Sequence, residues 1–204
     1  MLMFIFGLTG PSGAGKGTIA ELFAKYKVYS VDTDAVYHRL LIPPSACLDE
    51  LTARFGTGVL SPDGSLNRQA LAAVVFSDDN ALADLNAITH KYILARTKEA
   101  LDLYRAGNCP GAIVDAPLLF ESGAVQACGC QATIAVLADK SLRVSRIMER
   151  DGLTQEAAVH RIEAQKPDDF YIARADYVIY NNGLVSDLLP QVQRILRETA
   201  VIGQ

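Results

Sequence analysis

The chain has 204 residues, of which 50% are apolar and 21% are charged, and its formal net charge is −4. This length suits one domain, or one domain with insertions, and the composition is sufficient to bury a core. A net acidic chain lacks the lysine and arginine excess that sequence-independent nucleic-acid binding requires, so no nucleic-acid partner is expected. An anionic substrate must therefore be bound by a local basic site.

The four cysteines form no Cys-x-x-Cys pair and have no histidine cluster beside them, which argues against a zinc site. Cys128-Gly129-Cys130 leaves a redox or metal role open, but free thiols in a reducing cytosol are the favoured interpretation. The apolar start, Met1 to Leu8, is too short to span a membrane and lacks the basic segment of a signal peptide. No other stretch is long enough to cross a bilayer, so we expect a cytoplasmic protein without a membrane partner.

The first elements are a strand, a helix, a strand and a helix. The continuous apolar run Leu2–Thr9 predicts a central parallel strand that is covered on both faces. After a glycine-rich turn, Thr18–Tyr26 has the apolar spacing of a helix, and Val28–Val31 is a short strand. Ala35–Leu41 is expected to be a helix that stops before Pro43-Pro44.

From Leu48 to about Arg105 the pattern is helical, with longer helices at Leu66–Phe76 and Asn80–Tyr104, and it predicts a helical insertion. Glycine-rich turns interrupt it at residues 56–58 and 62–64. Strands and helices then alternate, as in a parallel sheet with right-handed crossovers. The expected strands are Gly111–Val114, Thr133–Ala138 and Tyr177–Tyr180, and the expected helices are Ser141–Asp151, Thr154–Lys166 and Leu184–Thr199.

The strongest signal is Gly10-Pro11-Ser12-Gly13-Ala14-Gly15-Lys16-Gly17-Thr18, which follows the first strand and opens the first helix, as a P-loop does. Glycines let successive backbone N–H groups point at phosphate oxygens, and the helix N-terminus adds partial positive charge. Lys16 is predicted to reach the β and γ phosphates of ATP and to stabilise the charge that develops between them.

Magnesium ligation is less clear from this motif. The usual pattern has serine or threonine directly after the lysine as a Mg²⁺ ligand, but this position is Gly17, and Thr18 comes one residue later. The Gly-Lys-Gly-Thr ending resembles adenylate kinases, in which the metal can be held largely through water. Thr18 is therefore a candidate Mg²⁺ ligand, directly or through water.

Three aspartates follow predicted strands. Asp32 and Asp34 close the second strand and Asp115 closes the third, so all three are expected at the sheet edge where ligands of open parallel sheets bind. A hydroxyl acceptor needs a carboxylate to orient it or to take its proton, and Asp34 is our choice for this role. Asp32 is a candidate for supporting the loop or the metal. Asp115 resembles a Walker B aspartate that holds Mg²⁺ through water. Taken alone, each aspartate is more often part of a turn or a helix cap, and it is their joint placement beside a P-loop that favours a functional role for Asp34.

Arginines accumulate after the fourth predicted strand. Arg143, Arg146 and Arg150 recur at spacings of three and four and share one helix face, and Arg161 follows on the next helix. A basic helical hairpin is what a lid needs to exclude water from ATP and to place positive charge on the migrating phosphoryl group. Arg146 is the best single candidate for that charge. We thus predict an α/β P-loop NTPase-type three-layer fold, with core 1–40, 107–140 and 175–204, an acceptor-binding insertion at about 41–106 and a lid at about 141–174.

Along nearly the whole chain, these residues resemble the dephospho-CoA kinase family. Each matching piece is short, but their order and spacing together are specific. The matching segments are Gly7 to Gly10, Asp32-Thr33-Asp34, Phe55-Gly56, Asp63 to Arg68, Leu85 to His90, Pro117 to Ser122, Arg150-Asp151, Leu153-Thr154, Arg161-Ile162, Gln165, and Ala175 to Gly183.

This resemblance implies transfer of a phosphoryl group from MgATP to the ribose 3′-hydroxyl of dephospho-CoA, the last step of coenzyme A synthesis. It implies Lys16, Asp34 and Arg146 as catalytic residues, and it places Asn181 in the segment that contacts adenine. The implied acceptor-binding residues are Asp34, His90, Pro117, Leu118, Phe120, Arg150 and Arg161. From residue type alone, His90 is more often a buried, hydrogen-bonded histidine and Phe120 a core residue.

Four positions depart from the family pattern: Gly17 replaces a hydroxyl, Lys91 a proline, Tyr171 a basic lid residue and His38 an arginine. Two other functions stay open. The Gly-Lys-Gly-Thr ending favours a nucleoside monophosphate kinase of the same fold, and a nucleotide-binding regulator without transfer activity is a third possibility. Intact Lys16, Asp34 and Arg146 argue against the regulator. The sequence does not give the oligomeric state, and we take a monomer as the expectation.

Overall fold

The computed structural model describes residues 3–76 and 78–203. The chain divides into two compact units, one formed by Met1–Val31 with Leu101–Gln204 and the other by Asp32–Ala100. The predicted helical insertion, at about 41–106, overlaps the second unit.

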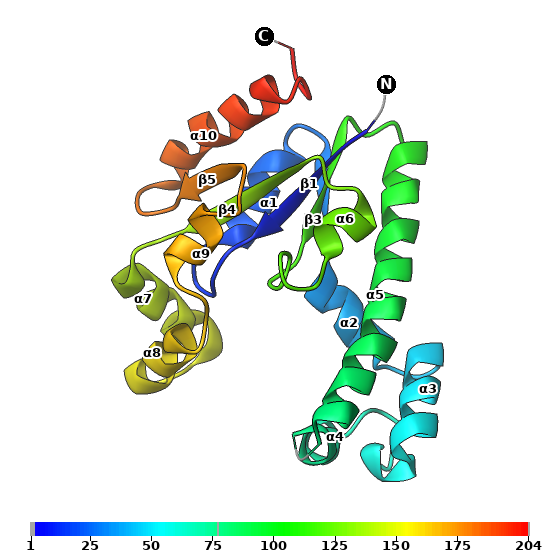
Figure 1. Cartoon of the computed structure of the whole chain (residues 1–204). Coiled ribbons are helices and arrows are strands. Elements are labelled where there is room, and N and C mark those ends of the chain that lie inside the picture. Colours follow the sequence, from blue (N-terminus) through cyan, green and yellow to red (C-terminus); the bar gives the residue numbers. More distant parts are fainter. Residues whose placement is uncertain (1–2, 77, 204) are drawn as a thin grey trace. The chain divides into compact units, whose positions relative to one another are not determined.

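A five-stranded parallel sheet forms the centre of the first unit, in the order β2-β3-β1-β4-β5 (Figure 1). This confirms the predicted α/β fold and its parallel sheet. The predicted first strand is confirmed from Phe4 onward, whereas Leu2 lies outside the described residues. The strands are β1 (Phe4–Thr9), β2 (Val28–Asp32), β3 (Gly111–Asp115), β4 (Ala132–Leu137) and β5 (Tyr177–Tyr180).

Strand β1 is central because it pairs in parallel with β3 on one side and with β4 on the other. Leu8 lies opposite Asp115 of β3, and Thr9 lies opposite Ala135 of β4. Residues 5–9 of β1 and all of β4 are buried, which explains their continuous apolar sequence. The segments that leave β1 and β3 therefore begin at the same edge of the sheet, where ligands bind in this class of fold.

One face of this sheet carries the main core, under helices α1 (Lys16–Ala24) and α10 (Val185–Glu198). The apolar stripes of both helices pack against the side chains of alternate strand residues. Fully buried members include Phe6, Leu8, Ile19, Phe23, Ile134, Ile179, Val192 and Ile195.

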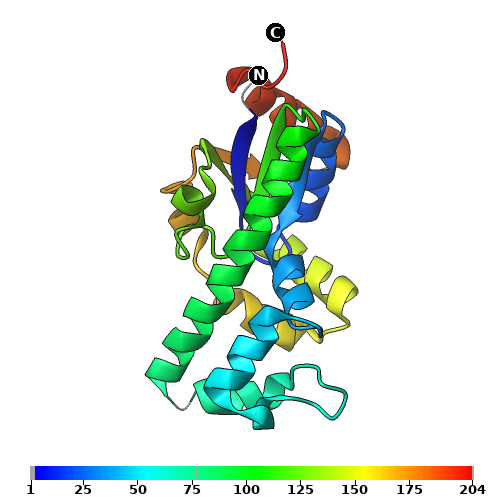
Figure 2. The same cartoon turned by 90° about the vertical axis from the view of Figure 1, so that its right-hand side faces the viewer.

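The second unit is helical and contains α2 (Thr33–Leu40), α3 (Ala46–Phe55), a 3₁₀ turn (Thr57–Val59), α4 (Arg68–Val75) and most of α5 (Asp79–Ala106). Side chains of Asp32, Ser45 and Asn67 cap α2, α3 and α4 by accepting backbone N–H groups. Helix α3 lies along α5 (Figure 2), and Leu51 of α3 packs with Leu85 and Ile88 of α5. The predicted helices at 66–76 and 80–104 are confirmed with ends that differ by one or two residues, since Asn67 caps α4.

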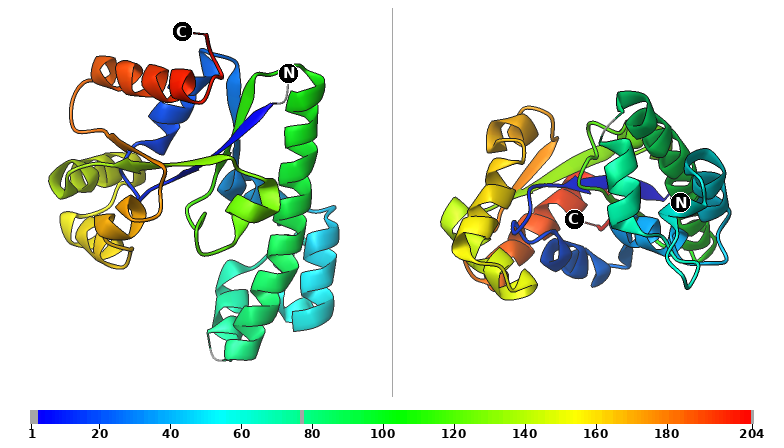
Figure 3. Two further views of the ribbon diagram at one scale, coloured as in Figure 1. Left: turned by 45° about the horizontal axis from the view of Figure 1, so that its top comes forward. Right: turned by 90° about the horizontal axis from the view of Figure 1, so that it is seen from below.

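After β4, the first unit continues with the helical hairpin α7 (Lys140–Asp151) and α8 (Gln155–Glu163), which lie side by side in Figure 3. Gly152 ends α7 in the left-handed conformation, and the Thr154 hydroxyl caps α8. The predicted helix Thr154–Lys166 was too long, since α8 ends at Glu163, and Pro167 disfavours helical geometry at Lys166. Two short helices were not predicted, α6 (Ala124–Cys128) and α9 (Asp168–Ile172).

None of the four cysteines, all of which lie within the described residues, forms a disulfide. Burial, and after it the neighbouring Cys128, raise the pKa of the Cys130 thiol to about 12, so this thiol stays neutral and is a poor nucleophile at physiological pH. This argues against a redox role for the Cys130 thiol. In the part of the chain that the structure describes, no helix is at once long enough and apolar enough to cross a membrane.

Candidate active site

The glycines of the phosphate loop allow an approach to neighbouring elements that no other residue permits. Gly10, Gly13 and Gly15 have φ angles of 140°, 78° and 94°, in the region that disfavours side chains. A Cβ atom at Gly10 would lie 2.2 Å from the Val136 carbonyl oxygen of β4, and one at Gly13 would lie 2.7 Å from the Arg143 carbonyl oxygen. The loop is therefore pressed against β4 and α7.

We expect Gly10→Ala to destabilise the fold by about 2 kcal/mol or more, because the new methyl group meets backbone rather than a movable side chain. Gly17→Ala is the matched control, since a Cβ atom there has nothing within 4 Å and the residue lies in α1. Urea unfolding of both variants measures the difference. Equal stability of the two variants would contradict the geometry described for Gly10.

Three arginines of α7 bind the loop. Arg143 Nε donates to the Ser12 carbonyl at 3.0 Å, Arg146 NH1 to the Gly13 carbonyl at 3.2 Å, and Arg150 NH2 to the Ser12 hydroxyl at 3.3 Å. Their spacing of three and four residues thus places them on one face, as predicted, and that face meets the loop. The guanidinium groups of these three arginines therefore lie next to the loop backbone that is predicted to bind phosphate.

Asn181, just after β5, also holds the loop. It is buried, its side-chain amide donates to the Ala14 carbonyl at 2.9 Å, and its backbone carbonyl accepts from Arg146 NH2 at 3.0 Å. A Cβ atom at Gly15 would lie 2.1 Å from this amide nitrogen. The role of Asn181 in binding ATP stays a prediction, but the structure gives it a second role as a support of the loop.

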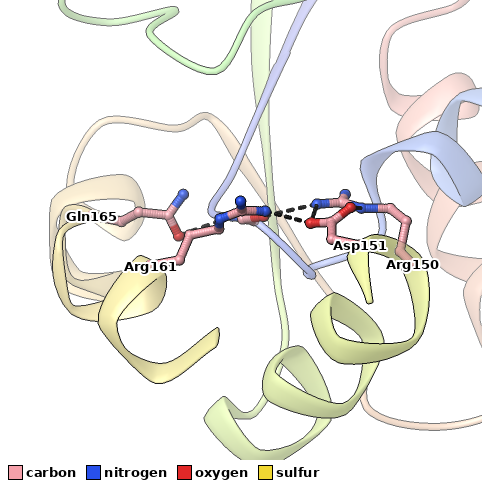
Figure 4. A network of polar contacts seen from close by, with 5 residues as sticks. Arg150, Asp151, Arg161 and Gln165 are labelled. Carbon is pink, nitrogen blue, oxygen red and sulfur yellow. Dashed lines mark hydrogen bonds and ion pairs between the residues drawn. The ribbon is translucent and has the colours of Figure 1, made fainter. Parts of the chain in front are cut away.

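Arg150 and Arg161 converge on Asp151 (Figure 4). Arg150 donates to both Asp151 oxygens at 2.8 and 2.9 Å, and Arg161 NH1 bonds the same carboxylate. These bonds, that of Arg150 first, lower the pKa of Asp151 to about 2, so the carboxylate is charged at all physiological pH values. The ion pair of Asp151 with Arg161 ties α7 to α8, and Arg150 also bonds the Ser12 hydroxyl of the loop.

Gln165, just after α8, also bonds the loop; it belongs to the segments that resemble the family, but the sequence predicted no role for it. Its side-chain oxygen accepts the Ser12 N–H and Arg143 NH2, both at 3.0 Å. Arg143 is only 5% exposed and its NH1 lies 3.6 Å from an Asp168 oxygen. Burial lowers the pKa of the Arg143 guanidinium and Asp168 opposes this, and arginine stays charged.

Lys16 is half-buried, and its ammonium donates to the Gly10 carbonyl at 3.4 Å, across the loop. Thr18 is half-buried in the first turn of α1. Asp115 is half-buried at the end of β3, opposite Leu8 of β1. Hydroxyl and carboxylate oxygens are ligands that Mg²⁺ accepts, so the residue types fit this ion.

The segment after β3 lies next to the end of β1. The Thr9 hydroxyl donates to the Pro117 carbonyl at 3.2 Å, and the Leu118 side chain is 58% exposed. Phe120 is half-buried against Phe170, with ring centroids 6.2 Å apart, beside the buried Tyr171. Tyr171, at a position where the family has a basic lid residue, is thus a core residue here.

The second unit carries two of the predicted site residues. Asp34 is exposed in the first turn of α2, and its backbone N–H is bound by the Asp32 carboxylate that caps this helix. His90 is exposed on α5, so the residue-type expectation of a buried histidine was wrong. Lys91 beside it pairs with Glu50 of α3, with a shortest distance of 2.5 Å.

Comparison with known proteins is consistent with this arrangement. Residues 4–187 match the family model for dephospho-CoA kinase. The dephospho-CoA kinase of Xanthomonas campestris pv. campestris is 41% identical over 196 residues, which cover 96% of this chain and 93% of that protein.

Two solved structures cover 97% of this chain, and 98% of each of those chains is matched. TT1252 from Thermus thermophilus has a TM-score of 0.80 at 33% identity, and a dephospho-CoA kinase from Campylobacter jejuni has a TM-score of 0.67 at 27% identity. These matches cover the chain almost from end to end and agree with its parallel sheet and its glycine loop. This chain therefore belongs to the dephospho-CoA kinase family.

Proposed function

We propose that this protein transfers the γ-phosphoryl group of ATP to the ribose 3′-hydroxyl of dephospho-CoA, giving coenzyme A and ADP. The observation that carries the proposal is the glycine loop with Lys16, bound on one side by Arg143, Arg146 and Arg150, in a chain that matches this family over residues 4–187. Phosphoryl transfer depends on positioning and on stabilisation of charge, and both are available at this loop.

In the proposed reaction, the loop from Gly10 to Thr18 and Asn181 bind ATP, while Lys16 and Arg146 neutralise charge on the migrating group. Asp34 takes the proton of the 3′-hydroxyl as that oxygen bonds to the γ-phosphorus and the bond from phosphorus to the ADP oxygen breaks. The proposed residues for the acceptor, besides Asp34, are His90, Pro117, Leu118, Phe120, Arg150 and Arg161.

Mg²⁺ is the proposed metal and accompanies ATP, with Thr18 and Asp115 as the residues that would hold it, directly or through water. When bound it would offset negative charge on the phosphate oxygens. Among residues 3–76 and 78–203, no group of three or more His, Cys, Asp or Glu is placed to hold a metal ion. Because Gly17 stands where a hydroxyl ligand is usual, we propose that the phosphates and water supply most of the ligands.

An acceptor assay tests this function. Purified protein with ATP and Mg²⁺ is offered dephospho-CoA, AMP or CMP, and ADP release is followed in a coupled assay. We expect the highest kcat/KM with dephospho-CoA. A higher value with AMP or CMP would identify a nucleoside monophosphate kinase, and nucleotide binding without turnover on any acceptor would identify a regulator.

We further propose that the protein acts in the cytoplasm, as a monomer, on these small substrates alone.

A further inference from the structure

Both polar groups of the Ser12 backbone are bound by side chains that lie far away in the sequence. The Ser12 N–H donates to Gln165 Oε1 at 3.0 Å, across 153 positions, and the Ser12 carbonyl accepts Arg143 Nε at 3.0 Å, across 131 positions. Arg143 NH2 donates to the same Gln165 oxygen at 3.0 Å. Three bonds thus form a closed clamp of Ser12, Arg143 and Gln165.

This clamp fixes the peptide groups on both sides of Ser12, immediately before Gly13. Glycines at 13 and 15 give the following backbone wide freedom, because they lack Cβ atoms. Arg143 is 5% exposed and its backbone lies against Gly13, so Arg143 is itself held in place by the residues packed around it. A flexible loop that is fixed at its start has less conformational entropy to lose when it binds a ligand.

We propose that Gln165 is a positioning residue, which with Arg143 holds the phosphate loop in the conformation that binds the triphosphate. This inference deepens the proposed function and rests on it for the identity of ATP as the ligand. Gln165 acts through the backbone of Ser12 and not on the reacting atoms. Its loss should weaken binding of the ground state and the transition state alike, which raises KM and leaves kcat nearly unchanged.

The test is Gln165→Met, which keeps the length of the side chain and removes the acceptor oxygen. We expect KM for ATP and the Kd for ADP, measured by calorimetry, to rise about ten-fold, the effect of leaving partly buried hydrogen-bonding groups unpaired. We expect kcat to change less than about three-fold.

A matched control separates positioning from stability. Gln131 Oε1 also accepts a backbone N–H, that of Ile5 at 2.8 Å, near the opposite end of β1. Gln131→Met should lower Tm and leave KM for ATP unchanged. If Gln165→Met does not fold, Gln165→Asn, which is too short to reach Ser12, takes its place.

The proposal is overturned if a folded Gln165→Met or Gln165→Asn variant binds ADP as the wild type does. It is also overturned if Gln131→Met raises KM to the same extent. Calorimetry with ADP needs no acceptor. Failure of the wild type to phosphorylate dephospho-CoA would therefore reject the proposed function and leave the comparison of ADP affinities valid.

Discussion

Replacing Lys16 with methionine is expected to lower kcat by about a hundred-fold or more and to weaken ATP binding as well. Methionine keeps most of the aliphatic stem, so the change removes the ammonium group rather than the packing. In the structure this ammonium donates to the Gly10 carbonyl at 3.4 Å and thus lies over the loop's own backbone. A cation in that place stabilises both the bound phosphates and the charge that builds up between them.

Lys25→Met is the control for Lys16→Met. Lys25 is an exposed lysine at the opposite end of the same helix, α1, where its loss should cost only a few tenths of a kcal/mol in stability. Steady-state kinetics and calorimetry on both variants give the comparison. A Lys16→Met protein with wild-type kcat and ATP affinity would remove the loop lysine from the mechanism.

The elements that sequence patterns predicted well are those whose cause is local. The apolar run before Gly10 predicts a central strand, because burial on both faces restricts each position to apolar residues. The loop glycines predict a phosphate loop, because positive φ angles favour glycine. The three α7 arginines follow from helical spacing in the same way. The sequence predicted that these arginines act at the phosphates, but it did not predict which atoms of the loop they bind.

The supports of the loop could not be predicted in this way. Gln165 and Ser12 are 153 positions apart, and nothing in either local pattern indicates that they meet. Phe120 and Tyr171 show the same limit, since the aromatic contacts that bury them against β4 come from folding and not from spacing. Helix α9 begins directly after Pro167, and proline is a local signal of a helix boundary. Its five residues, however, are too few to show a helical periodicity.

The second large effect is expected at Asp34. Asp34→Asn should lower kcat about a hundred-fold or more and leave the affinity for ATP nearly unchanged, because the amide cannot take the proton of the acceptor hydroxyl. The structure separates the two aspartates that follow β2. The Asp32 Oδ1 atom accepts the N–H groups of Asp34 and Ala35 and so caps α2, whereas the Asp34 side chain is exposed in the first turn. Helix capping thus accounts for Asp32 and leaves Asp34 as the candidate base.

Asp49→Asn is the matched control, since Asp49 is likewise an exposed aspartate in the first turn of a helix, α3, of the same unit. Both changes remove a negative charge that favours a helix N-terminus, and each should cost about 0.3–1 kcal/mol in stability. Only the change at Asp34 should reduce turnover of dephospho-CoA. Equal kcat values for the two variants would mean that Asp34 serves the helix and not the reaction, and the proton would then need another acceptor.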